Sequence, residues 1–390
     1  MNARYAMLWS ILILLLLPGT TACSVPRAGA TPSSDVSLNV FGAQQLLVSS
    51  PVPVTIVSEL SGEIQVISYP VAEVAVDSIT TGRGNTEDAV ALQAQQTNNV
   101  VLQFKDGGVL IQAQPGEAVP ERILLHVRVP NGSSIIVDSP RAAASVIVAG
   151  ETRDVRVQVR QGDIDVRGAT GNLDLRTERG SIVVDHRDGQ NRTLELHANE
   201  GEIALFALNA KVQASTTNGS IQFIGTLREM NGNAIGNFLS EFTIKGKGNI
   251  SVALPNNTKF RFRAFGGANV LTDLARDAEP CGLVSSPDYD FHRRLLKVGD
   301  AGRIEVGGTF TNTSQVQGIY GNGILYFETD RNLITVFDPP NPLPRSGGSS
   351  AGGTIGDCGR LTTENLAVAN TEFTVRADSG SIWIHQIKMR

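Results

Sequence analysis

Residues 161–223 read QGDIDVRGATGNLDLRTERGSIVVDHRDGQNRTLELHANEGEIALFALNAKVQASTTNGSIQF, the most regular stretch of the chain. One phrase, Gly-x-Ile-x-Val, returns in it as Gly162–Val166, Gly171–Leu175, Gly180–Val184, Gly201–Leu205 and Gly219–Phe223. Two copies without the glycine, Thr193–Leu196 and Lys211–Ala214, fill the gaps, so strands are expected to start about nine residues apart. A repeat of this kind, with glycine copies 18 or 21 residues apart, is typical of a solenoid.

Within each copy the apolar residues alternate with polar ones, as the side chains of a half-buried strand do. The expected inward set is Ile164/Val166, Leu173/Leu175, Ile182/Val184, Leu194/Leu196 and Ile203/Leu205. The expected outward set is Asp163/Asp165, Asn172/Asp174, Thr193/Glu195 and Gln213. One coil cannot bury its apolar row alone, so the coils are expected to stack. The glycines follow turn residues, where a positive φ is expected.

The composition agrees with an all-β chain. Among 390 residues there are 40 glycines, 18% charged residues and 5% aromatic residues, which suits short strands and tight turns better than helices. The sequence therefore predicts an all-β, single-stranded parallel β-solenoid or β-helix-like stack of short strands. Antiparallel pairing is allowed for the N-terminal part, and a pair of β-sandwich domains is the alternative architecture. A net charge of −5 without a Lys/Arg cluster argues against a nucleic-acid partner.

The first 23 residues have the pattern of a bacterial export signal. Arg4 supplies a positive charge, and Ala6–Leu17 is an apolar run too short to span a bilayer comfortably. The segment Thr20–Cys23 resembles a lipobox, although Thr20 stands where lipoboxes usually carry Leu. We therefore expect lipidation at Cys23 and a lipoprotein anchored to the bacterial cell membrane outside the cytoplasm. Secretion after cleavage at Ala30 is the alternative.

The cysteine count fits export. The chain has 3 cysteines, and with Cys23 assigned to the lipid, Cys281 and Cys358 remain as a pair. In an oxidising compartment these two are expected to form a disulfide. Two unpaired buried thiols are the alternative.

We expect one large β domain behind the export signal. The predicted parts are a signal peptide at 1–23, a flexible tether at 24–35, a β part at 36–130, regular repeats at 131–271, and C-terminal repeats with inserts at 272–390. The repeat is expected to run from Gly62 to Ile384. The segment Thr86–Gln95 fits a short helix about as well as a strand.

These motifs resemble the bacterial putative-adhesin domain family, a group of secreted and lipid-anchored β-solenoid proteins. The resemblance rests on Ser61–Val66, on Val127–Gly132, on the Gly-x-Ile phrases, and on Gly248–Pro255 followed by Gly266-Gly267. It covers roughly Val36–Leu271 well and the last third loosely. The long inserts and the pair Cys281/Cys358 depart from the family pattern. The resemblance implies an adhesin-like surface protein, and it implies no catalytic or ligand-binding residues.

The outward acids are the sharpest candidate site. Stacked coils would place Asp174 beside Glu195, with Asp163 and Asp165 nearby, and paired carboxylates can bind a cation or act on a sugar. The simpler interpretation is a solvated face whose charges are offset by arginines. The histidines have no metal-ligand spacing, and His186 and His197 are expected to be exposed strand residues. We expect no metal, no cofactor and no catalytic residue.

Three functions follow from these observations. The first is a non-catalytic, lipid-anchored envelope surface protein that binds through an extended β-solenoid face. The second is an enzyme acting on polysaccharide through the stacked acids. The third is a structural or sensory envelope component that binds a protein partner through the insert at 273–300. The expected partners are the membrane, through the N-terminal lipid, and an envelope polysaccharide or protein.

Overall fold

The computed structural model describes the chain in ranges. They are 36–49, 51–84, 100–115, 122–228, 240–255, 258, 260–266, 269–272, 279–284, 292–297, 303–307, 314–321, 324–329, 334–337, 371–379 and 381–387. All regular elements within them are strands, so the all-β prediction is confirmed. None of the described elements is a helix that could cross a membrane. Thr86–Gln95, Cys23 and Cys358 lie outside these ranges.

Ten strands make the regular part of the fold. They are β8 (Ile135–Ala149), β9 (Val155–Gln161), β10 (Ile164–Arg167), β11 (Leu173–Arg179), β12 (Ile182–His186), β13 (Arg192–Glu200), β14 (Ile203–Asn218), β15 (Ile221–Leu227), β16 (Ser240–Lys247) and β17 (Ile250–Pro255). Most of these strands pair in parallel with the strand that comes two places later in the chain. Ile164 of β10 thus lies beside Ile182 of β12, and Leu173 of β11 lies beside Leu194 of β13.

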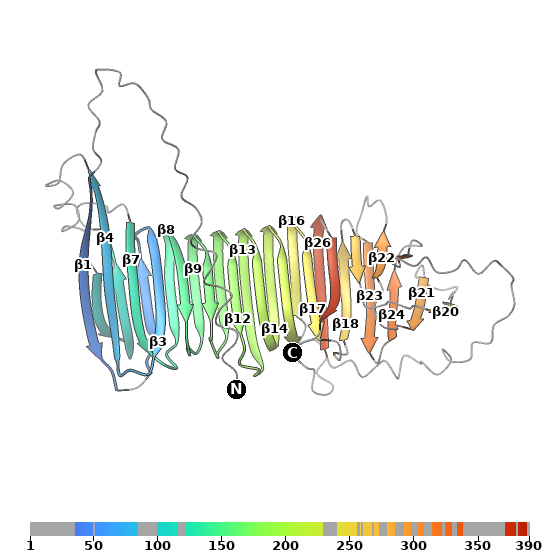
Figure 1. Ribbon diagram of the computed structural model, residues 1–390, viewed down its shortest axis with the longest axis horizontal. Helices are drawn as coiled ribbons and strands as arrows, with labels where there is room; N and C mark the ends of the chain where they lie inside the picture. The colour runs from blue at the N-terminus through green and yellow to red at the C-terminus, as the bar shows by residue number, and fades with distance from the viewer. Residues whose placement is uncertain are drawn as a thin grey trace, which may run out of the picture. The chain divides into compact units, whose positions relative to one another are not determined.

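These pairings form two ladders of parallel strands (Figure 1). The first ladder contains β8, β10, β12, β14, β15 and β17. The second ladder contains β8, β9, β11, β13, β14 and β16. Strands β8 and β14 are long enough to contribute one half to each ladder. One coil therefore consists of one strand from each ladder. For this reason, successive strong glycine copies are about two strands apart in the sequence.

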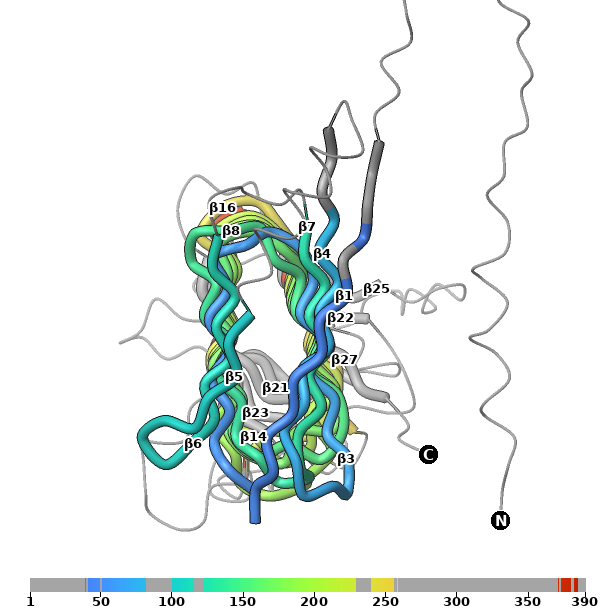
Figure 2. Tube along the Cα trace, turned by 90° about the vertical axis from the view of Figure 1, so that its left-hand side faces the viewer, coloured from blue at the N-terminus to red at the C-terminus, as the bar shows by residue number. Residues whose placement is uncertain are grey.

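The alternating apolar side chains of both ladders point into one common core. Ile164, Val166, Leu173 and Leu175 are at most 2% exposed, and the equivalent residues of the other coils are buried as well. Burying such a side chain stabilises the fold by about 1.5–3 kcal/mol. Seen end-on, the traces of successive coils superimpose around this core (Figure 2). The expected inward set is confirmed.

The glycines of the first ladder are required because neighbouring coils touch there. Gly180, Gly201 and Gly219 have φ of 145°, 153° and 145°, as expected from the sequence. A Cβ on Gly201 would lie 1.9 Å from the carbonyl oxygen of Gly180, and one on Gly219 would lie 1.9 Å from that of Gly201. No other residue fits this approach without moving the backbone.

The order of the coils in space differs from their order in the sequence. The last two strands, β26 (Thr371–Ser379) and β27 (Ser381–Ile387), pair in parallel with β16 and β17. Their other edges pair with β18 (Phe260–Gly266) and β19 (Asn269–Thr272). The C-terminal strands therefore lie between two coils that precede them in the chain (Figure 1).

Beyond β18 and β19 the pairing becomes antiparallel. The strands are β20 (Glu279–Val284), β21 (His292–Lys297), β22 (Arg303–Gly307), β23 (Ser314–Gly321), β24 (Ile324–Thr329) and β25 (Ile334–Phe337). β23 pairs antiparallel with both β18 and β24, and β22 does so with both β19 and β25. The expectation of further parallel repeats in this part is wrong. Strands that follow each other with only two residues between them, as Gly321 of β23 and Ile324 of β24 do, can pair only antiparallel.

The N-terminal part mixes both kinds of pairing. Its strands are β1 (Val36–Leu47), β2 (Val54–Ser58), β3 (Gly62–Tyr69), β4 (Glu73–Gly84), β5 (Val100–Lys105), β6 (Gly108–Ala113) and β7 (Arg122–Pro130). β2 and β3 pair in parallel with β8 on one edge, and with β6 and β7 on the other. The pairs β1–β4, β4–β7 and β5–β6 are antiparallel. The antiparallel pairing that the sequence allowed for this part is thus present in its outer strands.

Candidate functional site

The outward face of the second ladder gathers polar side chains in straight rows. Because the strands are parallel and in register, equivalent residues of successive coils lie side by side. One row runs through Arg156, Asp174, Glu195, Gln213 and Glu241. The next row on the same face runs through Gln158, Arg176, His197, Ser215 and Thr243. The site is therefore built by register rather than by any one loop.

Arginine side chains neutralise the acids of this face. The Nε of Arg176 donates to Oδ1 of Asp174 at 2.7 Å, and its Nη2 lies 3.8 Å from Oε2 of Glu195. The Nε of Arg156 lies 3.6 Å from Oδ2 of Asp174. The hydrogen bond to Asp174 raises the pKa of Arg176 above its ordinary value. Asp174 and Glu195 thus belong to a network of ion pairs along the stack.

His197 occupies the centre of the face. Its Nδ1 lies 2.7 Å from Oγ of Ser215, its neighbour in the row. Burial, and then the positive charges of Arg176 and Lys245, lower the pKa of His197, while the carboxylates of Asp174 and Glu195 oppose this effect. The imidazole is therefore neutral at neutral pH.

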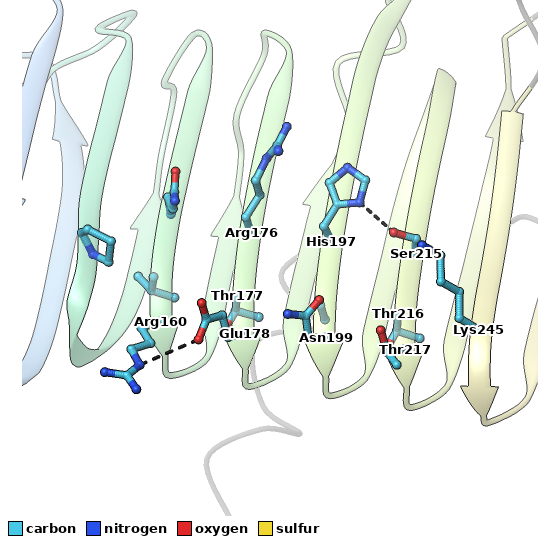
Figure 3. A pocket seen from close by; sticks show the side chains of 14 residues that line it. Arg160, Arg176, Thr177, Glu178, His197, Asn199, Ser215, Thr216, Thr217 and Lys245 are labelled. Atoms are coloured by element: carbon cyan, nitrogen blue, oxygen red, sulfur yellow. Dashed lines mark hydrogen bonds and ion pairs between the residues drawn. The ribbon is translucent and has the colours of Figure 1, made fainter.

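Two shallow hollows lie on this face. The first has a volume of about 360 Å³, and its polar lining is Gln158, Arg160, Arg176, Glu178, His197, Asn199, Ser215, Thr217 and Lys245. These side chains come from strands β9, β11, β13, β14 and β16 and lie on one side of the ladder (Figure 3). The second has a volume of about 600 Å³ and is lined by Asp154, Arg156, Asn172, Asp174, Thr193 and Glu195 among others. The pair Arg176–Asp174 links them, since Arg176 lines the first hollow and Asp174 the second.

Charged and hydrogen-bonding groups dominate the first hollow. Three cations, Arg160, Arg176 and Lys245, line it with one carboxylate, Glu178, which lies 3.8 Å from Arg160. Amide and hydroxyl groups of Asn199, Ser215 and Thr217 supply the neutral part. The side chains can therefore hydrogen-bond to hydroxyl groups and attract anionic groups of a ligand that lies across the strands.

The four predicted acids do not form one site. Asp174 and Glu195 are neighbours in register, as the stacking argument expects. Asp165 lies on β10 in the first ladder, where Nε of Arg167 donates to its carboxylate at 2.8 Å. The carboxylate of Asp163 accepts the backbone N–H of Ser181 at 2.7 Å. The expectation that Asp163 and Asp165 lie near Asp174 is wrong, because strands nine residues apart belong to different ladders.

The expectation for His186 is also wrong. Its side chain is fully buried at the end of β12, and its Nε2 lies 3.0 Å from the carbonyl oxygen of Gly171. His186 aligns with Ala207 of the next coil. The imidazole is therefore part of the buried interior rather than of the outward surface.

The structure adds residues that the sequence motifs did not single out. Arg160, Ser215 and Lys245 join His197 in the first hollow only because the coils are in register. An alignment of the repeat copies could have placed Arg176, His197 and Ser215 in one row, but not Arg160 or Lys245. Within the described ranges, no group of three His, Cys, Asp or Glu side chains is arranged to hold a metal ion. Cys358 is outside those ranges, so its pairing with Cys281 stays a prediction.

No family model and no curated protein matches the sequence of this chain. Its structure is similar to bacterial putative adhesins. One from Bacteroides fragilis shares 13% identity over 55% of this chain and 89% of its own length, with a TM-score of 0.35. A putative cell adhesion protein from Clostridium sporogenes shares 8% identity over 90% of this chain and 100% of its own length, with a TM-score of 0.25. A putative adhesin from Parabacteroides distasonis shares 12% identity over 55% of this chain and 90% of its own length, with a TM-score of 0.29.

Proteins of this kind are the ones that the sequence resemblance predicts.

Proposed function

We propose that the chain is a non-catalytic, adhesin-like surface protein of the bacterial envelope, held at the membrane by a lipid on Cys23. In this proposal the two ladders are the sides of a β-solenoid, and the protein binds an extended ligand along the outward face of the second ladder. A solenoid offers long regular surfaces and needs no deep cleft to bind a polymer.

The observation that carries the proposal is the in-register row Gln158–Arg176–His197–Ser215–Thr243, which crosses five strands beside a shallow hollow. A row that repeats its hydrogen-bonding groups once per coil suits a ligand that is itself a repeating polymer. The cations Arg160, Arg176 and Lys245 favour an acidic polysaccharide over a neutral one.

The arrangement gives little support to catalysis by the acids. Asp174 accepts from Arg176 at 2.7 Å and also lies 3.6 Å from Arg156, and Glu195 shares the same Arg176. A catalytic carboxyl group has to be free to reach the bond that is cleaved, whereas Asp174 and Glu195 are both engaged by arginine side chains. The polysaccharide-cleaving enzyme is therefore the weaker alternative.

The test is a binding screen of the protein against immobilised acidic and neutral bacterial polysaccharides. Arg176→Gln combined with Lys245→Gln should weaken binding to the acidic polymers roughly tenfold or more, because two charge-assisted hydrogen bonds are lost.

The matched control is Arg167→Gln. This variant removes an arginine of the first ladder. Like Arg176, Arg167 pairs with the carboxylate of the residue two positions before it in the chain, here Asp165. Equal binding by the control and by the Arg176→Gln/Lys245→Gln variant would reject the second ladder as the binding face. Release of reducing ends from any bound polysaccharide would reject the non-catalytic proposal.

A further inference from the structure

Strand β1 is the outermost strand at the N-terminal end of the stack (Figure 1). In the described part of the chain it pairs with β4 alone, so its other edge is open. Outward from β8, the first ladder continues through β3, β7, β4 and β1, whereas the second continues through β2, β6 and β5. β1 therefore lies one strand further out than β5, and β5 does not screen its open edge.

The open edge of β1 lacks the usual protection against pairing with a strand of another chain. Edge strands of natural proteins are typically short, or carry charged residues or proline. β1 is 12 residues long, and its sequence, VSLNVFGAQQLL, contains neither a charged residue nor a proline. Its edge is therefore suited to accept a further strand.

Half of the backbone groups of β1 face this open edge. The N–H of Val48, directly after β1, donates to the carbonyl oxygen of Ala72 at 3.0 Å and continues the register of β1 and β4. Alternate residues of an antiparallel strand bond to the same neighbour. The N–H and C=O groups of the odd-numbered residues in 41–47 therefore point away from β4, towards the place of a partner strand.

Two of these residues carry exposed apolar side chains at symmetric positions. Leu47 is 79% exposed and Phe41 72%, the two highest values for a large apolar side chain in the described ranges. Both lie on the outward side of β1, because the intervening Leu46 packs against the core and strand side chains alternate. Phe41 precedes Gln44 by three residues, and Leu47 follows it by three. If two β1 strands pair antiparallel with Gln44 at the centre, Phe41 of each copy faces Leu47 of the other.

Gln44 also closes the edge of the second ladder. Its Nε2 donates to the carbonyl oxygen of Val100 at 2.6 Å, and its Oε1 accepts the N–H of Leu102 at 2.9 Å. The amide thus takes the position beside β5 that a peptide group of an added strand would take. A partner strand therefore finds its hydrogen-bonding groups on β1 and not on β5.

We propose that two copies of the chain associate end to end through an antiparallel pair of their β1 strands. In this dimer Gln44 lies opposite Gln44 of the second copy, Ala43 opposite Gln45, and Phe41 opposite Leu47. The pairs of Ala43 with Gln45 and of Phe41 with Leu47 exchange backbone hydrogen bonds, and their side chains lie on one face.

The self-complementary positions of Phe41 and Leu47 favour a second copy over an unrelated strand. The contact is twofold symmetric, so it closes after two copies. It lies at the end of the stack and not on the face of the second ladder, so it goes beyond the proposed function and does not depend on it.

Sedimentation velocity of the chain from Ser24 on, which keeps every described strand, tests this proposal. The parent chain should form a dimer whose fraction rises with concentration. Ala43→Pro should raise the dissociation constant of this dimer roughly tenfold or more, because proline lacks the N–H that the partner strand needs. That N–H points away from β4, so the pairing of β1 with β4 is kept, and the urea midpoint should stay close to that of the parent chain.

Phe41→Ser with Leu47→Ser should also weaken the dimer roughly tenfold or more, because the facing apolar side chains are lost while the backbone is unchanged. The matched control is Ile136→Ser with Val183→Ser. It removes two exposed apolar residues from β8 and β12, at positions where the strand is paired on both edges. This control should dimerise as the parent chain does.

A parent chain that stays monomeric at every concentration would overturn the proposal. So would a dimer that neither the Ala43 variant nor the Phe41/Leu47 variant weakens, or an oligomer larger than a dimer, since both require another surface. If Ala43→Pro lowers the urea midpoint, the serine variant and its control decide alone.

Discussion

His197 and Ser215 lie side by side on neighbouring coils, with Nδ1 of the imidazole 2.7 Å from the hydroxyl oxygen. Eighteen residues separate them in the chain, which is one coil. Their contact shows how the stack assembles a surface from residues that no short motif brings together. It also makes the titration of His197 a sensitive probe of this surface.

The lowered pKa of His197 predicts how stability depends on pH. The pKa lies below 6.5 in the folded chain, because of burial first and then Arg176 and Lys245, so the unfolded chain takes up this proton at a higher pH. The contribution of His197 to the free energy of unfolding is therefore complete above about pH 6.5. It is lost as the pH falls below that value, and levels off below the folded pKa. In urea denaturation between neutral pH and about pH 5, His197→Gln should lose less stability than the parent chain.

NMR titration of the His197 ring checks the same prediction directly. Arg176→Gln should move its pKa back towards 6.5, because a positive charge that lowers it is removed. A ring that titrates above 6.5 in the parent chain would contradict the burial and charge argument.

Gly201→Ala should destabilise the fold by about 2–4 kcal/mol. The residue has a φ of 153°, and an added Cβ would lie 1.9 Å from the carbonyl oxygen of Gly180, so the coils would have to separate. Gly189→Ala is the control. It also changes a glycine of positive φ, 67°, but has no atom within 4 Å of the added Cβ, so its cost should be about 1–2 kcal/mol. Urea midpoints measure both; equal losses would show that the contact between coils is not the cause.

Phe242→Ala should cost about 3–5 kcal/mol. The ring is fully buried, 5.4 Å from the ring of Phe223 and 6.4 Å from that of Phe373, between centroids. Its removal leaves a cavity where β16 meets the inserted strand β26. Phe242→Leu fills most of that space and should cost less than the alanine variant in the same denaturation experiment. A loss below 1 kcal/mol for alanine, on the order of a surface change, would mean that this part of the core is loosely packed.

Cys23→Ala should abolish incorporation of labelled fatty acid in a bacterial host. The thiol of Cys23 is the predicted attachment point of the lipid, and alanine offers no sulfur to acylate. Cys281→Ala should be labelled as the parent chain is. Labelling that persists in Cys23→Ala would show that the lipobox interpretation is wrong.

Much of the central fold follows from local sequence. The alternation in Leu173–Leu175 predicts which side chains are buried, and Gly180 and Gly201 have the positive φ that their turns suggest. The length of the repeat also predicts that Asp174 and Glu195 are neighbours on adjacent coils. The separation of Asp165 from Asp174 does not follow from it, because the period of about nine residues gives no information on which ladder a strand joins.

Local sequence is enough for three rules: a strand about every nine residues, one apolar side to each strand, and glycine where a turn needs a positive φ. These rules are local because they depend on side-chain alternation and backbone sterics within a few residues. The order of the coils follows only from the assembled fold, in which β26 lies between β16 and β18, and β27 lies between β17 and β19. Backbone hydrogen bonds at a strand edge are the same for every sequence, so several strands with matching alternation could occupy that edge. The partners of Arg176, His197 and Gln44 were settled by the same assembly, because each lies beside a residue of another strand.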